Sequence, residues 1–186
     1  MSWSTSRKGR HIALWSHIEK RTIEFSCNND FVDTNVQMEY IIPQTVDLYY
    51  FELNILKRND SSIDFGLVPS NADTNDGVGW IDDSIGYLSY DGSIRHSSNV
   101  TANTIGSFDA GDLVGCLLRQ IQCGERVIKF CQFTKNGRLI GRTVLLKSNV
   151  ELRPAVGFHG NLGDSALVNT NFGENKFRFS VEGKIS

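Results

Sequence analysis

The chain has 186 residues, of which 40% are hydrophobic and 22% charged, and its formal net charge is -2. This length supports one domain with a sizeable core, and the composition is that of a globular protein rather than a disordered one. A nearly neutral charge balance excludes the basic footprint typical of nucleic-acid-binding domains, so no nucleic-acid partner is expected.

Residues 1–10 are polar and show no hydrophobic period, so they are predicted to form an N-terminal tail. Residues 11–181 are predicted to form a single domain. The sequence has neither a run of 18 apolar residues nor the apolar core of a signal peptide, so we expect a cytoplasmic protein without a membrane partner. The four cysteines lack C-x-x-C spacing, and Cys116 and Cys131 fall in apolar stretches, which predicts free, reduced thiols.

Hydrophobic periodicity then defines the elements in chain order. Ile12, Trp15 and Ile18 are spaced three apart, as in a short helix, whereas residues 23–25 already alternate as in a strand. From residue 36 the period is two, and strands are predicted at residues 36–42, 49–55, 63–68, 84–90, 112–120, 127–134, 138–145, 153–158, 166–172 and 177–181. Many short strands separated by turn residues predict an all-β fold, a two-sheet antiparallel β-sandwich whose N-terminal segment could be helical.

Three long gaps separate these strands, at residues 69–83, 92–110 and 159–165. Loops of this length without structure of their own usually bind something or are disordered. Polar and aromatic side chains in and beside them suit contacts with a peptide, and Arg95 suits an acidic ligand side chain. The predicted partner-binding residues are Asn71, Asp73, Tyr90, Arg95, His96, His159 and Asn161.

Catalytic and metal sites are not predicted. Asp82 and Asp83 are adjacent, so their carboxylates should point to opposite sides rather than share a substrate. The four histidines show no zinc-binding spacing, Cys116 should be buried and inert, and no glycine-rich phosphate loop precedes a helix. We therefore expect a protein that is not an enzyme and has no cofactor.

Five motifs occur in a fixed order along the chain. They combine a Gly-Trp segment leading into S-x-G-Y and Asp-Gly, a G-D-x-V-G-C turn and strand, an F-T-K-N-G hairpin, an L-x-P-x-V-G strand and a final N-F-G. They are Gly77–Gly92, Gly111–Cys116, Phe133–Gly137, Leu152–Gly157 and Asn171–Gly173. This ordered set resembles the SPRY domain from about Tyr50 to Phe177, and it looks most like the Ran-binding-protein-M branch and the SPRY-only proteins near it.

The resemblance implies a non-enzymatic interaction module that binds a short peptide segment of a partner through loops at one end of the sandwich. Such domains also serve as recognition parts of larger, ubiquitin-ligase-like assemblies, and a monomer is expected. The resemblance places Trp80 inside the protein, leaves Tyr87 open between core and contact, and puts Tyr90 at the rim. Leu88 stands where the Ran-binding-protein-M branch usually has His, so the ligand preference of that branch does not transfer directly.

Three questions stay open at the level of sequence. The sandwich is shared with lectins, and a carbohydrate-binding module would use exposed aromatics or a calcium site, for which Asp73, Asn75 and Asp76 are the available cluster. The chain is either a free-standing SPRY protein or one domain of a longer one. The identity of the partner lies in loop side chains whose arrangement the sequence does not give.

Overall fold

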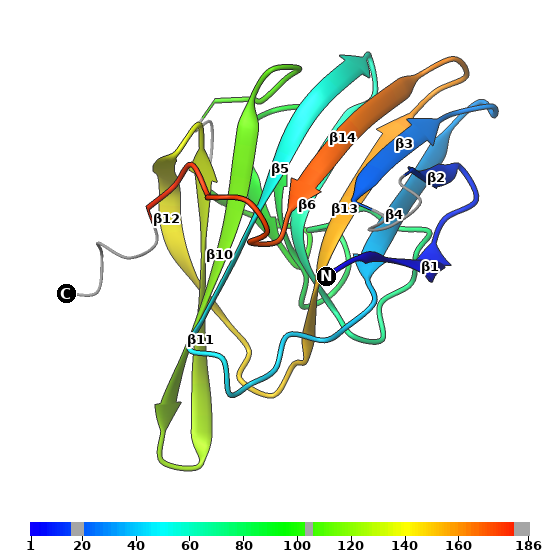
Figure 1. Cartoon of the computed structure of the whole chain (residues 1–186). Coiled ribbons are helices and arrows are strands. Elements are labelled where there is room, and N and C mark those ends of the chain that lie inside the picture. The colour runs from blue at the N-terminus through cyan, green and yellow to red at the C-terminus, as the bar shows by residue number, and fades with distance from the viewer. Residues whose placement is uncertain (16–20, 103–105, 181–186) are drawn as a thin grey trace.

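The computed structural model describes residues 1–15, 21–102 and 106–180, which form two packed antiparallel sheets (Figure 1). Each sheet has seven strands, and the described residues contain no helix. In sheet order, sheet A is β1 (Trp3–Lys8), β4 (Val32–Met38), β13 (Leu152–Gly160), β6 (Ser62–Pro69), β7 (Ile85–Leu88), β8 (Ile94–His96) and β9 (Asn99–Ala102). Sheet B is β12 (Arg138–Leu146), β11 (Arg126–Lys135), β10 (Leu113–Cys123), β5 (Leu48–Asn59), β14 (Ser165–Asn171), β3 (Thr22–Ser26) and β2 (Ile12–Trp15). The predicted all-β sandwich is confirmed.

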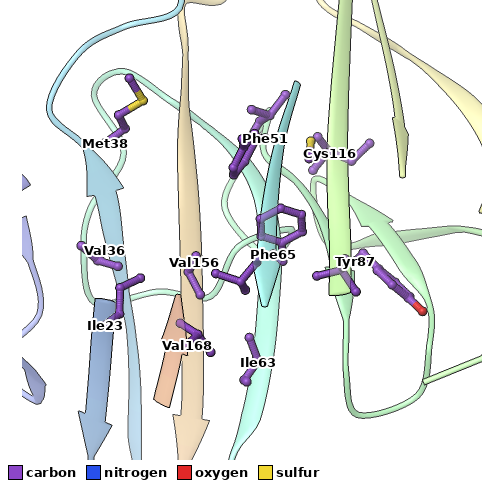
Figure 2. Packing of buried hydrophobic residues seen from close by; sticks show 14 of the residues in the cluster. Ile23, Val36, Met38, Phe51, Ile63, Phe65, Tyr87, Cys116, Val156 and Val168 are labelled. Atoms are coloured by element: carbon purple, nitrogen blue, oxygen red, sulfur yellow. The ribbon is translucent and has the colours of Figure 1, made fainter. Parts of the chain in front are cut away.

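The core lies between the sheets and follows from the period-two pattern. Phe51 of β5 and Phe65 of β6 are fully buried, and their ring centroids are 4.8 Å apart across the interface (Figure 2). Phe133 and Tyr87 extend this aromatic cluster along the sandwich. Each such ring removes roughly 150–250 Å² from water, so the facing aromatics supply much of the apolar burial. Tyr87 is therefore a core residue.

The N-terminal segment differs from expectation. Residues 1–10 are not a free tail, because Trp3–Lys8 form β1 at the edge of sheet A. Trp3 is 1% exposed, and its indole N–H donates to the Thr170 hydroxyl at 3.0 Å. The helical alternative for residues 11–20 is wrong where the structure describes it, since Ile12–Trp15 form β2; residues 16–20 lie outside the described part.

Two predicted strands also differ. The strand expected at residues 36–42 is β4, which begins at Val32 and ends at Met38, and Tyr40 beyond it is 65% exposed. The strand expected at residues 177–181 is absent from residues 177–180, which bend across the outer face of sheet B; residue 181 is not described. There the buried Glu52 carboxylate accepts the backbone N–H groups of Arg178 at 2.9 Å and Phe179 at 3.2 Å. These bonds to a side chain take the place of a strand ladder.

Residues 70–84, which we call the strap, cross the outer face of sheet A. The Asn35 amide of β4 donates to the backbone carbonyls of Asp73 at 2.8 Å and Asp76 at 2.7 Å. Val78 packs against the outward side chains of sheet A. Gly86 permits this approach, because a Cβ there would lie 2.4 Å from the Val78 carbonyl oxygen. The strap is thus a packed part of the domain rather than a free loop.

Three of the four cysteines are buried, and Cys123 is exposed. The sulfurs of Cys116 and Cys131 lie 3.6 Å apart, too far for a disulfide. Within the residues that the structure describes, no helix is long and apolar enough to cross a membrane.

Candidate functional site

Strand register defines two ends of sheet A. Ser62 pairs with His159, and Asp64 pairs with Leu88, so the start of β6, the end of β7 and the end of β13 share one end. We call this the Ser62 end. Pro69 pairs with Leu152, and Ile85 pairs with His96, which defines the opposite, Pro69 end.

A charged cluster lies on the outer face near the Ser62 end. His159 Nδ1 is 3.1 Å from an oxygen of Asp33 on β4, and Nε2 is hydrogen-bonded to Asp64 on β6. Burial would lower the pKa of His159, but the two carboxylates outweigh it and raise the pKa to about 10. Burial raises the pKa of Asp64, opposed by the charge of His159. His159 is therefore an imidazolium shared by two carboxylates at neutral pH, which fixes its ring in place.

The strap adds Trp80 to this cluster. The Trp80 side chain lies beside Asp64, where it favours the charged carboxylate and opposes the rise in the pKa of Asp64. Gly77 makes room for this contact, since a Cβ there would lie 2.5 Å from the His159 ring and 2.7 Å from the Trp80 ring. The core position that the family resemblance favours for Trp80 is wrong, because its side chain is 40% exposed on the outer face.

Arg95 of β8 completes the charged part of the site. Its guanidinium carbon lies 4.1 Å from the centroid of the Trp80 ring, and one of its nitrogens is 3.5 Å from the Asp91 carboxylate. Stacking and pairing hold the guanidinium while its outer edge stays accessible, since the side chain is 20% exposed. An accessible, fixed arginine can bind a carboxylate of a ligand.

Exposed apolar side chains gather at the same end. Tyr90, in the turn that contains Asp91, is 81% exposed, which confirms its predicted surface position. Phe31 directly precedes β4 and is 64% exposed, and Leu162 is the second residue after β13 and is 67% exposed. We define the Trp80 surface as Phe31, Asp33, Trp80, Tyr90, Arg95 and His159. Sequence reasoning missed Phe31 and Asp33, because nothing in a single sequence shows that β4 lies beside β13.

The seven residues predicted to bind a partner divide between the two ends. Tyr90, Arg95, His159 and Asn161 lie at or near the Ser62 end. Asn71, Asp73 and His96 lie toward the Pro69 end. The structure therefore brings four of the predicted residues to one end and separates the other three from them.

The three separated residues have local surroundings of their own. Asp73 accepts the backbone N–H and the side-chain amide of Asn75, at 2.9 and 2.8 Å, so its carboxylate shapes its own turn. Asn71 is exposed. His96 lines a hollow with Leu146 and Lys147 at the edge between the sheets, and burial lowers its pKa, so its ring is neutral at pH 7. None of the three adjoins Trp80.

Metal binding has little support from the described residues. They contain no group of three or more His, Cys, Asp or Glu side chains arranged to hold an ion. The surface at the Ser62 end is suited to contacts by stacking, apolar burial and charge pairing.

A two-sheet β-sandwich that displays exposed aromatics and fixed charges at one end is the architecture of a binding domain. Comparison with known proteins identifies the family. The chain belongs to the SPRY domain family, whose model matches residues 48–174. Domains of this family generally serve as protein–protein interaction modules.

Known relatives match this chain over 69% to 100% of its length. Ran-binding protein 10 of Danio rerio is 28% identical over 186 residues, which is 100% of this chain and 29% of the relative. Ran-binding protein 9 of Homo sapiens is 30% identical over 97% of this chain and 24% of its own length. SPRY domain-containing protein 3 of Homo sapiens is 32% identical over 69% of this chain and 29% of its own length. The chain thus spans less than a third of the relatives it matches.

Solved structures share the fold. The SPRY domain of human HERC1 matches with a TM-score of 0.67 and 18% identity, covering 94% of this chain and 100% of that one. A human SPRY domain matches at 0.60 and 22% identity, over 90% of this chain and 98% of that one. The metal-free carbohydrate recognition domain of Emp46p matches at 0.55 and 8% identity, over 90% of this chain and 89% of that one. At these identities the likeness concerns the fold alone.

Proposed function

We propose that this SPRY domain is a non-enzymatic module that binds a short peptide segment of a partner protein through the Trp80 surface. The observation that carries the proposal is that three exposed aromatic side chains, Phe31, Trp80 and Tyr90, lie on the part of sheet A that also carries a fixed charged cluster near its Ser62 end. Aromatic and arginine side chains dominate the binding energy of protein interfaces, which makes this surface the best candidate on the domain.

The proposed mechanism depends on a surface that is already ordered. Trp80 and Arg95 stack on each other, Arg95 also pairs with Asp91, and His159 is held by two carboxylates. A ligand that docks here orders few side chains, so little of the binding free energy is lost to entropy. The aromatic rings would bury ligand side chains, and Arg95 would pair with an acidic ligand residue.

The wider setting follows from the resemblance and from the size of the relatives. Since the relatives are more than three times as long as the matched segment, we propose that the domain acts as the recognition part of a larger, ubiquitin-ligase-like assembly. A cytoplasmic location, reduced cysteines and a monomeric domain belong to the same proposal.

A carbohydrate-binding function is the second candidate, supported by the fold it shares with the Emp46p carbohydrate recognition domain. Exposed aromatic rings such as Tyr90 could stack on a sugar. The charged cluster favours a peptide, because an arginine beside carboxylates is suited to an ionic ligand.

The proposal is tested by selecting peptides from a random library on the domain and measuring their affinity by fluorescence anisotropy. We expect Trp80→Ala and Tyr90→Ala each to weaken binding by about 30-fold or more, the effect of a hot-spot residue. Tyr40→Ala is the matched control, because Tyr40 is 65% exposed beyond the opposite end of β4 and should leave affinity within about twofold.

The outcomes separate the candidate functions. Equal losses in the Trp80 and Tyr40 variants would contradict the proposed surface. A glycan array that retains ligands while no peptide is selected would favour the carbohydrate-binding candidate. Melting temperatures of all variants, measured in parallel, show whether a loss of affinity reflects a loss of folding.

A further inference from the structure

The turn between β8 and β9 departs from the chemistry that hairpin turns favour. His96 pairs with Asn99, so Ser97 and Ser98 alone form the loop. Their φ angles are 51° and 65°, both in the left-handed region. Two-residue loops of this kind favour Asn-Gly or Gly-Gly, because these residues adopt positive φ at little cost. Two consecutive serines in this conformation are strained, and such strain persists where neighbouring contacts compensate for it.

The contacts of Ser98 go to the strap beside Trp80. The Ser98 hydroxyl donates to the Trp80 carbonyl at 2.6 Å, and the Ser98 backbone N–H donates to the Gly79 carbonyl at 2.8 Å. The Trp80 N–H donates in turn to the Gly77 carbonyl at 3.2 Å. Both polar groups of the Trp80 backbone are therefore bonded, and the bond to its carbonyl comes from the Ser98 hydroxyl.

Ser97 holds the end of the strap. Its hydroxyl accepts the Asp83 backbone N–H at 2.8 Å, and its own N–H donates to the Ser84 carbonyl at 3.1 Å. The first half of the strap is anchored to β4 by the Asn35 amide, which donates to the carbonyls of residues 73 and 76. The serine turn supplies the corresponding anchor for the second half.

The same hairpin also holds the Trp80 side chain. Arg95 of β8 lies three residues before Ser98, and its guanidinium carbon is 4.1 Å from the centroid of the indole ring. A Cβ on Gly79 would lie 3.3 Å from the Arg95 Cβ, so the strap and β8 are in close contact at this point. The hairpin therefore fixes Trp80 twice, at its ring through Arg95 and at its carbonyl through Ser98.

From these contacts we infer that Ser97 and Ser98 are positioning residues of the Trp80 surface, which fix Trp80 without touching the ligand. The turn follows His96 at the Pro69 end, so the two serines act on the surface through the strap. The consequence for binding rests on the proposed function. An aromatic anchor that is ordered before the ligand arrives loses less entropy on binding, so loosening this turn weakens the affinity for a peptide.

Closure of the hairpin does not account for the two serines. Glycine at both positions would form the turn without strain, but it would offer no hydroxyl to the strap. Burial does not account for them either, since Ser98 is exposed and Ser97 is half-buried. The side-chain bonds to Trp80 and Asp83 are what serine provides here and glycine does not.

Replacing both serines with glycine tests this role. Ser97→Gly with Ser98→Gly relieves the strain, keeps the backbone bonds and removes both hydroxyl bonds, so the melting temperature should stay within about 5 °C of wild type. Ser98→Ala removes only the bond to the Trp80 carbonyl. Asn136→Gly is the matched control, because Asn136 has a φ of 52° in the β11–β12 turn and its side chain bonds Asp112 and Leu113 rather than the strap.

Two readouts follow Trp80 in these variants. In protein labelled with fluorotryptophan, the fluorine NMR resonance that Trp80→Phe removes should shift toward that of the free amino acid in the double-glycine variant, and partly so in Ser98→Ala. The resonance of the buried Trp3 should stay in place. Affinity for a peptide selected on the wild-type domain, measured by anisotropy, should fall by about tenfold in the double-glycine variant. Asn136→Gly should change neither readout.

The outcomes distinguish this inference from the proposed function. A Trp80 resonance that stays in place in the double-glycine variant would refute positioning by the turn. A resonance that shifts while affinity stays within about twofold of wild type would make the serines structural only, which also overturns the inference. If no peptide binds the wild-type domain, the proposed function fails, and the fluorine resonance alone decides whether the turn positions Trp80.

Discussion

Replacing His159 with glutamine tests the charged cluster beneath the Trp80 surface. Glutamine keeps roughly the length and hydrogen-bonding capacity of the histidine but carries no charge, so Asp64, whose side chain is 1% exposed, loses its cationic partner. Breaking a buried ion pair by removing one partner costs about 3–5 kcal/mol, and protonation of Asp64 limits the loss. We expect His159→Gln to lower the free energy of unfolding at pH 7 by about 2–4 kcal/mol.

The pH dependence of this effect has a definite sign. The folded-state pKa of His159, about 10, lies above its ordinary value of 6.5. A raised pKa means that the stabilisation is complete below about pH 6.5 and is lost as the pH rises toward 10. The pKa shift of His159 corresponds to at most about 5 kcal/mol of stabilisation, and the cost of burying Asp64 cancels part of it. The difference in stability between wild type and variant should therefore shrink from pH 7 to pH 10.

Urea unfolding followed by tryptophan fluorescence at several pH values measures this difference directly. His11→Gln serves as the control, because the His11 side chain is only partly buried and forms no ion pair among the described residues. A wild-type-minus-variant difference that stays constant from pH 7 to pH 10 would show that His159 contributes by packing rather than by charge. A difference near zero at pH 7 would refute the reasoning altogether.

Three further substitutions test the contacts that hold the strap, the C-terminal segment and β1 in place. Gly86→Ala places a Cβ 2.4 Å from the Val78 carbonyl oxygen, so we expect the free energy of unfolding to fall by about 1–3 kcal/mol. Because the strap would have to shift, acrylamide should quench tryptophan fluorescence more strongly, and unchanged quenching would contradict a packed strap. Glu52→Ala removes the acceptor that holds residues 178 and 179, so the free energy of unfolding should fall by about 1–3 kcal/mol and amide hydrogen exchange at those two positions should speed up. Amides that stay protected would show that apolar contacts alone hold this segment. Trp3→Ala should cost about 3–5 kcal/mol in a urea titration, and a negligible change would mean that β1 adds little to the fold.

The sequence determined most strands by itself. Alternating apolar residues predict β5 and β6, and the turn residues between runs separate the strands that form the sandwich. The Asn136-Gly137 pair correctly marks the hairpin between β11 and β12, since both residues have positive φ there. These features are local, because strand period and turn chemistry depend on residues a few positions apart.

The edges of the fold were harder to predict for the same reason. β1 alternates too weakly to be recognised, since Trp3 is its one large apolar residue, and only the contact of Trp3 with Thr170 shows that it belongs to the sandwich. Phe177 and Phe179 have the spacing of a strand, yet the Glu52 side chain satisfies the backbone N–H of Phe179 and leaves no ladder. In both cases a partner more than a hundred residues away decides the outcome.

The site depends even more on tertiary structure. Tyr90 could be placed at the surface from its position before a turn, but Asp33, Asp64 and His159 come together only because β4, β6 and β13 are neighbours in sheet A. Trp80 is exposed rather than buried because glycines let the strap lie flat on the sheet and hold the indole at its outer surface. Local sequence fixes the period and the turns, whereas strand order and the packing of the strap, which bring distant charges and rings together, arise only when the whole chain has folded.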